Sequence, residues 1–92
     1  MNTDYKDSKY KEKEVTEKII GIFYKVYNTL GYGFLEKVYE NAMMLDFKKE
    51  NILAVSQYAI KVFYENKIVG EYFADILVDG KVIVEIKAAR NL

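Results

Sequence analysis

The stretch from Phe73 to Lys87 constrains the fold more than any other part of this 92-residue chain. Its residues are mostly apolar and strand-forming, and an Asp-Gly pair at 79–80 divides it into two halves, a strong short-range signal for a β-hairpin. Three charged side chains interrupt the apolar pattern: Asp75, Glu85 and Lys87. A charge in a buried strand costs several kcal/mol unless it is paired or binds a metal. The three charges therefore need a structural or functional reason.

The loop at Asp79-Gly80 decides whether these charges share one face of the sheet. Glu85 and Lys87 share a face because strand side chains alternate with a period of two. A two-residue loop would place Asp75 and Glu85 on opposite faces. A three-residue loop, with Gly80 left-handed in a bulge, makes them diagonal neighbours on one face. Both loops are compatible with the sequence, and we favour the second because it gathers the charges. Its loop is Val78-Asp79-Gly80, and its pairs are Leu77 with Lys81 and Asp75 with Ile83.

Upstream of the hairpin, the apolar pattern changes to a helical period. Apolar residues recur at spacings of three and four from Glu14 onward, and Gly31-Tyr32-Gly33 is typical of a helix end. A second helix is expected from Phe34 to Asn51. The predicted core stripes are Val15, Ile19, Ile22, Phe23, Val26 and Leu30 in the first helix, and Leu35, Val38, Ala42 and Leu45 in the second.

Three strands are expected after the helices, which predicts an α+β fold with an antiparallel meander. The predicted strands are Ala54 to Tyr64, Ile68 to Val78 and Lys81 to Ala88, with a turn at Glu65-Asn66-Lys67. The predicted core face of the last two strands is Ala74, Ile76, Val78, Val82, Val84 and Ile86. We expect one domain over residues 14–92, preceded by a polar segment at residues 1–13.

Composition limits the chemistry that the charges can perform. The chain has no Cys and no His, so a metal site must be built from oxygen ligands, which favours Mg²⁺, Mn²⁺ or Ca²⁺. The formal net charge is zero, so bulk charge gives no signal for nucleic acid. No apolar run approaches the ~20 residues that span a bilayer, so we expect a cytoplasmic protein without a membrane partner.

The charges suit metal-assisted hydrolysis of a phosphodiester. Mg²⁺ or Mn²⁺ bridging Asp75 and Glu85, with the backbone carbonyl of Ile86 as a further ligand, would relieve the repulsion between the carboxylates. Lys87 could orient or deprotonate the attacking water, and Glu36 could hold the water shell of the metal. The alternatives are that Glu36 is a first-turn acid that complements the helix dipole, and that Lys87 forms an ion pair.

Three segments resemble blocks of a known family. Residues 33–39, Gly-Phe-Leu-Glu-Lys-Val-Tyr, match a Gly-x-x-Glu-x-x-Tyr signature, and residues 70–75 and 84–88 are similar to the later blocks. From about residue 16 onward the chain resembles the GxxExxY protein family, a branch of the PD-(D/E)XK nuclease superfamily. The resemblance implies a restriction-endonuclease-like core and a nuclease that acts on DNA or RNA. The implied catalytic residues are Glu36, Asp75, Glu85 and Lys87, with Gly33, Tyr39 and Gly80 in support.

The chain also departs from the family pattern. Ala74 stands where the superfamily name has a proline, and family members usually continue past the Glu-x-Lys strand with a helix and further strands. With the chain ending at Leu92, we expect the core to be truncated and the third strand to be an exposed edge that pairs with another chain, giving a homo-oligomer. The alternative to a nuclease is a catalytically inactive interaction or oligomerisation module.

Overall fold

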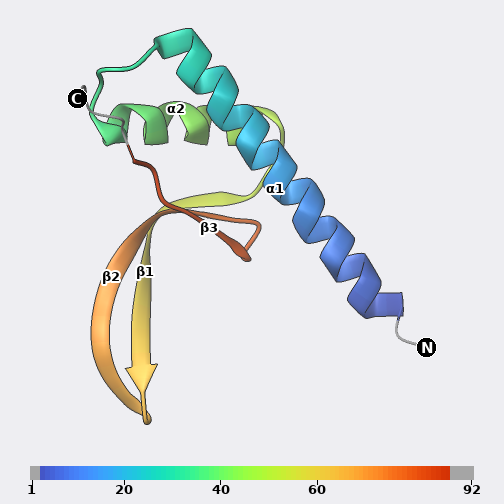
Figure 1. The fold of residues 1–92 in the computed structure, drawn as a ribbon, viewed down its shortest axis with the longest axis vertical. Helices are drawn as coiled ribbons and strands as arrows, with labels where there is room; N and C mark the ends of the chain where they lie inside the picture. Colours follow the sequence, from blue (N-terminus) through green and yellow to red (C-terminus); the bar gives the residue numbers. More distant parts are fainter. Residues whose placement is uncertain (1–2, 88–92) are drawn as a thin grey trace.

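The computed structural model describes residues 3–87, and the side chains from Glu12 onward. Two helices, α1 (Thr3–Leu30) and α2 (Glu36–Lys49), precede three strands, as Figure 1 shows. The strands β1 (Ala54–Tyr64), β2 (Lys67–Val78) and β3 (Val82–Val84) form one antiparallel sheet in the order β1-β2-β3. The predicted α+β class and meander are therefore confirmed. No helix among the described residues is long and apolar enough to cross a membrane.

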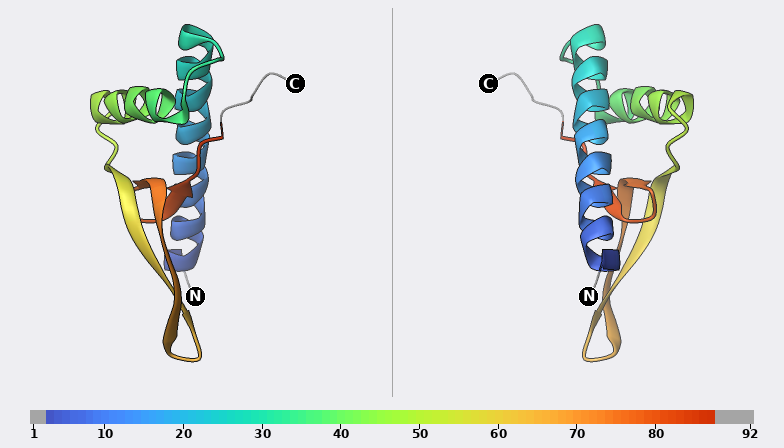
Figure 2. Two further views of the ribbon diagram at one scale, coloured as in Figure 1. Left: turned by 90° about the vertical axis from the view of Figure 1, so that its left-hand side faces the viewer. Right: turned by 90° about the vertical axis from the view of Figure 1, so that its right-hand side faces the viewer.

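The core lies where the two crossed helices meet one end of the sheet. The other end of the β1–β2 hairpin extends away from both helices (Figures 1 and 2). The predicted apolar face of the last two strands is confirmed, because Ala74, Ile76 and Val78 have no exposed surface and Ile86 is 5% exposed. The helices contribute Ile19, Ile22, Val26, Tyr39, Met43 and Phe47 to this core.

Helix α1 begins earlier than its apolar period predicts. It starts at Thr3 instead of near Glu14. Charged residues such as Lys and Glu are good helix formers, so a polar segment can extend a helix that gains stability from packing further along. The predicted end is correct: the helix stops at Leu30, and Gly31 has a φ of +77°. The boundary between a polar segment and a domain at residue 14 stays a prediction.

Helix α2 buries a different face from the predicted one. The predicted stripe is wrong, because Leu35 and Leu45 are 73% and 64% exposed and Val38 is also exposed, while only Ala42 is half-buried. The buried residues are Tyr39, Glu40, Met43, Asp46 and Phe47. Two apolar stripes compete on this helix, and the one with larger side chains faces the core because it removes more apolar surface from water.

The two hairpin turns use left-handed backbone conformations. Glu65 and Asn66 have φ values of +50° and +65°, which is the combination that a tight two-residue hairpin loop requires. Lys67, which was predicted in this turn, begins β2 instead. Gly80 has the predicted positive φ of +66°, and Asp79 before it has +54°. The Asp79 N–H donates to the Leu53 carbonyl at 2.7 Å, so the second turn is anchored beside the start of β1.

Candidate active site

The β2–β3 hairpin places Asp75 and Glu85 at neighbouring positions. The loop has three residues, but the predicted pairs are wrong by two positions on β3: Leu77 faces Ile83 instead of Lys81, and Ile76 faces Val84. The loop residues are therefore Asp79, Gly80 and Lys81. Both ends of the loop move by one residue, which preserves the parity of the pairing. Asp75 and Glu85 are therefore the next directly opposed positions in this register, not the predicted diagonal neighbours.

The Asp75 carboxylate takes part in ending β3. Its Oδ2 accepts the backbone N–H of Ile86 at 2.7 Å. A side chain thus occupies the place of a backbone acceptor, and regular pairing stops at Val84 rather than reaching Ala88 as predicted. Ala88 itself lies outside the described residues. This hydrogen bond ties Asp75 directly to the middle of the Glu-x-Lys segment, 85–87.

The side chains of the Glu-x-Lys segment face outward on either side of a buried residue. Glu85 and Lys87 are exposed, whereas Ile86 between them packs into the core at 5% exposure. Alternation therefore holds both charged groups away from the core while Asp75, half-buried, stands beside them. A phosphate or cation in solvent can reach the two exposed groups without opening the core.

Glu36 is the first residue of α2 and is exposed. This position fits the alternative of a first-turn acid that complements the helix dipole. Among residues 12–87, whose side chains the structure describes, no three or more Asp or Glu side chains form a group that could hold a metal ion. Glu36, Asp75 and Glu85 therefore do not make a three-carboxylate cluster in the described chain. The catalytic roles of Glu36, Asp75, Glu85 and Lys87 stay predictions.

The oxygen atoms of Asp75, Glu85 and the Ile86 carbonyl are nevertheless suitable ligands for a hard cation. Mg²⁺ usually keeps several waters and is held by one or two carboxylates together with substrate phosphate. Asp75 and Glu85 supply two carboxylates at neighbouring register positions, and the backbone carbonyl of Ile86 is the predicted third oxygen. These residues would hold the ion, and bound Mg²⁺ or Mn²⁺ would lower the pKa of a water and polarise a phosphoryl oxygen.

Tyr39 of the Gly-x-x-Glu-x-x-Tyr signature forms hydrogen bonds with the loop between the helices. It is 3% exposed, its hydroxyl donates to the Gly31 carbonyl at 2.6 Å, and it accepts the Phe34 N–H at 3.4 Å. Its ring stacks on Tyr27 with centroids 6.0 Å apart. Tyr39 thus packs and forms hydrogen bonds within this loop, and Gly33 with a φ of +108° lies in the same loop. The signature therefore fixes where α2 begins, and with it Glu36.

A buried carboxylate on the same helix was not predicted from the sequence. Glu40 is 3% exposed; its Oε1 accepts the Gln57 amide at 3.0 Å, and its Oε2 pairs with Lys37 at 2.9 Å. Gln57 lies in β1 between the residues that face Ile76 and Ala74, which places it beside Asp75 in the register. Its φ of +53° is a local distortion of the strand. Glu40 lies on the buried stripe of α2, which the sequence does not distinguish from the exposed one, and no signal in the sequence marks the distortion at Gln57.

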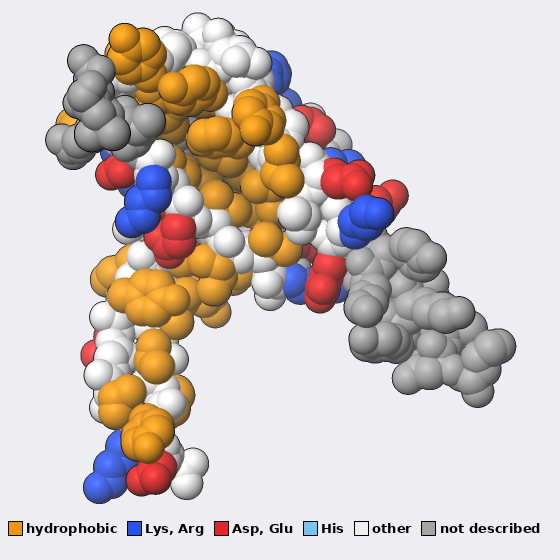
Figure 3. All heavy atoms as spheres, in the orientation of Figure 1, with side chains coloured by type: hydrophobic (Ala, Val, Ile, Leu, Met, Phe, Trp, Pro, Cys, Tyr) orange, Lys and Arg blue, Asp and Glu red, His pale blue; other side chains and the backbone are white. Residues whose placement is uncertain are grey.

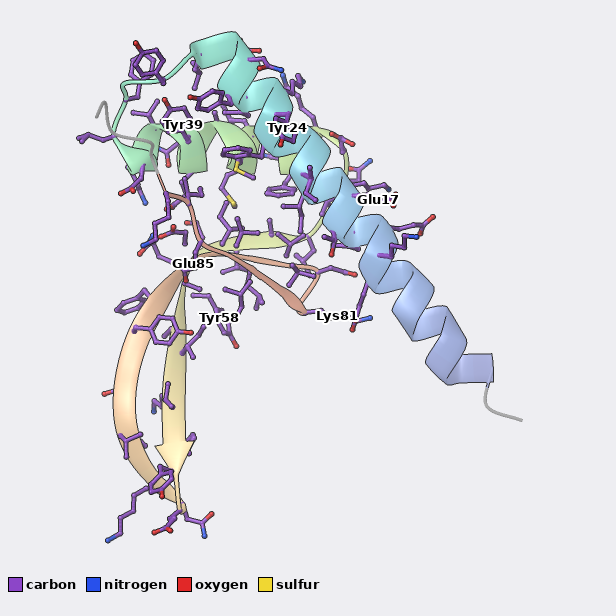
Figure 4. The ribbon with its side chains drawn as sticks, in the orientation of Figure 1. Glu17, Tyr24, Tyr39, Tyr58, Lys81 and Glu85 are labelled. Carbon is purple, nitrogen blue, oxygen red and sulfur yellow. The ribbon has the colours of Figure 1, made fainter. Side chains whose placement is uncertain are left out.

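An apolar hollow adjoins the Glu-x-Lys segment. It is open to solvent, has a volume of about 420 Å³, and lies between α1, Met43 of α2 and residues 84–87 at the end of β3 and after it. Its lining is Ile19, Ile20, Phe23, Tyr24, Met43, Val84, Glu85, Ile86 and Lys87. Figure 3 shows hydrophobic side chains gathered on this face of the molecule, and Figure 4 shows Tyr24 on α1 and Glu85 where the last strand ends.

Comparison with known proteins assigns the family. A sequence model of the PD-(D/E)XK nuclease superfamily matches residues 13–92, a range that contains both helices' buried faces, the whole sheet and all four candidate catalytic residues. No curated protein and no solved structure matches the chain. Because the family match covers far more than half of the sequence, the chain belongs to the PD-(D/E)XK nuclease superfamily.

Proposed function

We propose that this protein is a metal-dependent nuclease of the GxxExxY branch that hydrolyses phosphodiester bonds of DNA or RNA. The observation that carries the proposal is the hydrogen bond from the Ile86 N–H to the Asp75 carboxylate. It links the strand aspartate to the Glu-x-Lys segment, the pattern that names the superfamily. The exposed Glu85 and Lys87 stand on either side of that bond.

Each residue has a distinct role in this proposal. Asp75 and Glu85 hold Mg²⁺ or Mn²⁺ with the Ile86 carbonyl, and Lys87 orients the attacking water and stabilises negative charge on the phosphate. Glu36 acts through the water shell of the ion. Gly33, Tyr39 and Gly80 support these residues by fixing the loop before α2 and the turn before β3.

The proposal can be tested by a cleavage assay with labelled single- and double-stranded DNA and RNA in Mg²⁺, Mn²⁺ or EDTA. Asp75→Asn, Glu85→Gln and Lys87→Ala should each lower the rate by about 10² to 10⁴, the usual contribution of a positioned acid or base. Glu71→Gln is the matched control, because Glu71 is an exposed β2 carboxylate away from the site. Equal rates in all variants would contradict the assignment of the site.

A non-catalytic interaction module is a second candidate, favoured by the apolar surface of the hairpin. Phe63, Tyr64, Val69 and Phe73 are each 62–67% exposed, and β3 is an edge of the described sheet. Such surface is typical of an interaction site, here with a second copy of the chain paired along β3. Wild-type protein that cleaves nothing, binds no Mn²⁺ in calorimetry and forms a dimer in light scattering would support the module and exclude the nuclease.

A further inference from the structure

The hollow beside the Glu-x-Lys segment contains an aromatic face that the proposed hydrolysis does not use. Tyr24 lines it and is 59% exposed, and its ring meets Phe23 edge-to-face at 5.9 Å. Ile20, one turn earlier on α1, is 49% exposed. Tyr24 and Ile20 thus present apolar surface to solvent on α1, next to Ile19 and Ile22, which are buried.

The opposite wall of the hollow is made by the proposed catalytic segment. Glu85 and Lys87 both line it, together with Val84 and Ile86. A phosphate held at the Lys87 ammonium would therefore have an aromatic and aliphatic surface beside it. The volume of about 420 Å³ and the mostly apolar lining with two charged groups are typical of pockets that hold small ligands.

We infer that this hollow receives a nucleobase next to the phosphate that is cleaved, with the base stacked on Tyr24. The inference rests on the proposed function and names its substrate class as single-stranded or unpaired nucleic acid. A planar base matches the ring of Tyr24 and the apolar lining. The negative charge of the adjoining backbone phosphate matches the Lys87 ammonium. Bases in an intact duplex are paired and stacked on each other, so a duplex base must first leave the stack to enter.

The chain offers a direct spectroscopic test because it contains no tryptophan. Tyr24→Trp keeps a stacking face and introduces a single indole at the hollow. Tyr32→Trp is the matched control, since Tyr32 is 66% exposed in the loop between the helices and does not line the hollow. The probe is a short labelled oligothymidylate, titrated as a single strand and as a duplex with oligoadenylate, in EDTA so that no cleavage occurs.

We expect the single strand to quench the fluorescence of Tyr24→Trp and to leave Tyr32→Trp unchanged. Tyr24→Ala should weaken single-strand binding about tenfold, the typical effect of losing one base–aromatic stack, and Tyr24→Phe should retain it. Duplex binding should be weaker and insensitive to Tyr24→Ala. Equal quenching at both positions, or single-strand binding unaffected by Tyr24→Ala, would overturn the inference. A change of dimerisation in Tyr24→Ala without a change in binding would also overturn it, because the hollow would then receive a protein partner.

The cleavage assay separates this inference from the proposed function. If the wild type cleaves nucleic acid but Tyr24→Ala keeps the same preference between single strand and duplex, the inference fails while the nuclease stands. If no variant cleaves but Tyr24→Trp is quenched selectively by the single strand, the nuclease fails and the stacking site stands. Circular dichroism of each variant checks that α1 remains folded.

Discussion

The β1–β2 hairpin is covered by the helices at one end and exposed to solvent at the other. At one end, from Ala54 paired with Val78 to Ser56 paired with Ile76, the sheet lies under the helices, and we call this the covered end. At the other end, residues 58–73 form a projecting arm that no helix reaches (Figure 1). Ile76 and Val78 have no exposed surface, whereas Tyr72, on the same face of the same strand, is 47% exposed.

This difference shows that alternation predicts which side chains share a face but does not predict which part of that face is buried. The arm keeps the apolar pattern of the covered end, with Tyr58 and Val62 42–43% exposed on its core-side face. Its opposite face carries Lys61 and Glu71, which face each other across the strands. An isolated two-stranded ribbon is marginally stable in water, so the arm should open more readily than the covered end.

The largest expected difference between the two ends is in the response to losing one isoleucine side chain. Ile76→Ala should lower the free energy of unfolding by about 2–5 kcal/mol, because it leaves a cavity among fully buried residues. Ile68→Ala, at a position 50% exposed on the arm, should change it by less than about 0.5 kcal/mol. Urea titration followed by circular dichroism measures both values. Similar losses at the two sites would mean that the arm is covered in solution.

A second contrast concerns the polar contacts of the two ends. Gln57→Ala should lower the free energy of unfolding by about 1–3 kcal/mol, since it removes a hydrogen-bond donor from the buried Glu40 carboxylate. Glu71→Ala should lower the free energy of unfolding by less than about 1 kcal/mol, because Glu71 is exposed and a charge that faces Lys61 across the strands contributes little there. The same urea titration measures the free energy of unfolding of both variants. A cost at Gln57 no larger than at Glu71 would show that water replaces the amide, and that Glu40 is reached by solvent.

Most of the fold could be predicted because local chemistry determines it. The glycines after Leu30 end α1, the Asp79-Gly80 pair turns the chain, and alternation assigns Ile76 and Ile86 to the core face. The choice of face on α2 could not be predicted, because Leu35, Val38 and Leu45 form a stripe as regular as the buried one. Only packing against α1 and the sheet distinguishes the two.

The proximity of Asp75 and Glu85 could be predicted from the sequence, whereas the detailed geometry around them could not. The parity of the hairpin brings Asp75 and Glu85 to neighbouring positions, although the individual pairs are shifted. The hydrogen bond between Asp75 and Ile86 depends on where β3 stops, and the contact of Gln57 with Glu40 depends on a backbone distortion within β1. Both are tertiary features without a residue pattern of their own, so the structure was needed to find them.

The smallest contrast compares the two turns and tests whether the arm unfolds with the rest of the protein. Glu65 at the arm's tip and Asp79 at the covered end both have positive φ values, of +50° and +54°. A glycine relieves this strain but adds freedom to the unfolded chain, so each replacement should stabilise its turn by roughly 0.5–1 kcal/mol. If the arm opens first, Glu65→Gly should slow amide hydrogen exchange in residues 58–73 by about two- to fivefold and leave the global free energy of unfolding unchanged. Asp79→Gly should instead raise the global value. An equal rise in both variants would show that the arm and the covered end unfold as one unit.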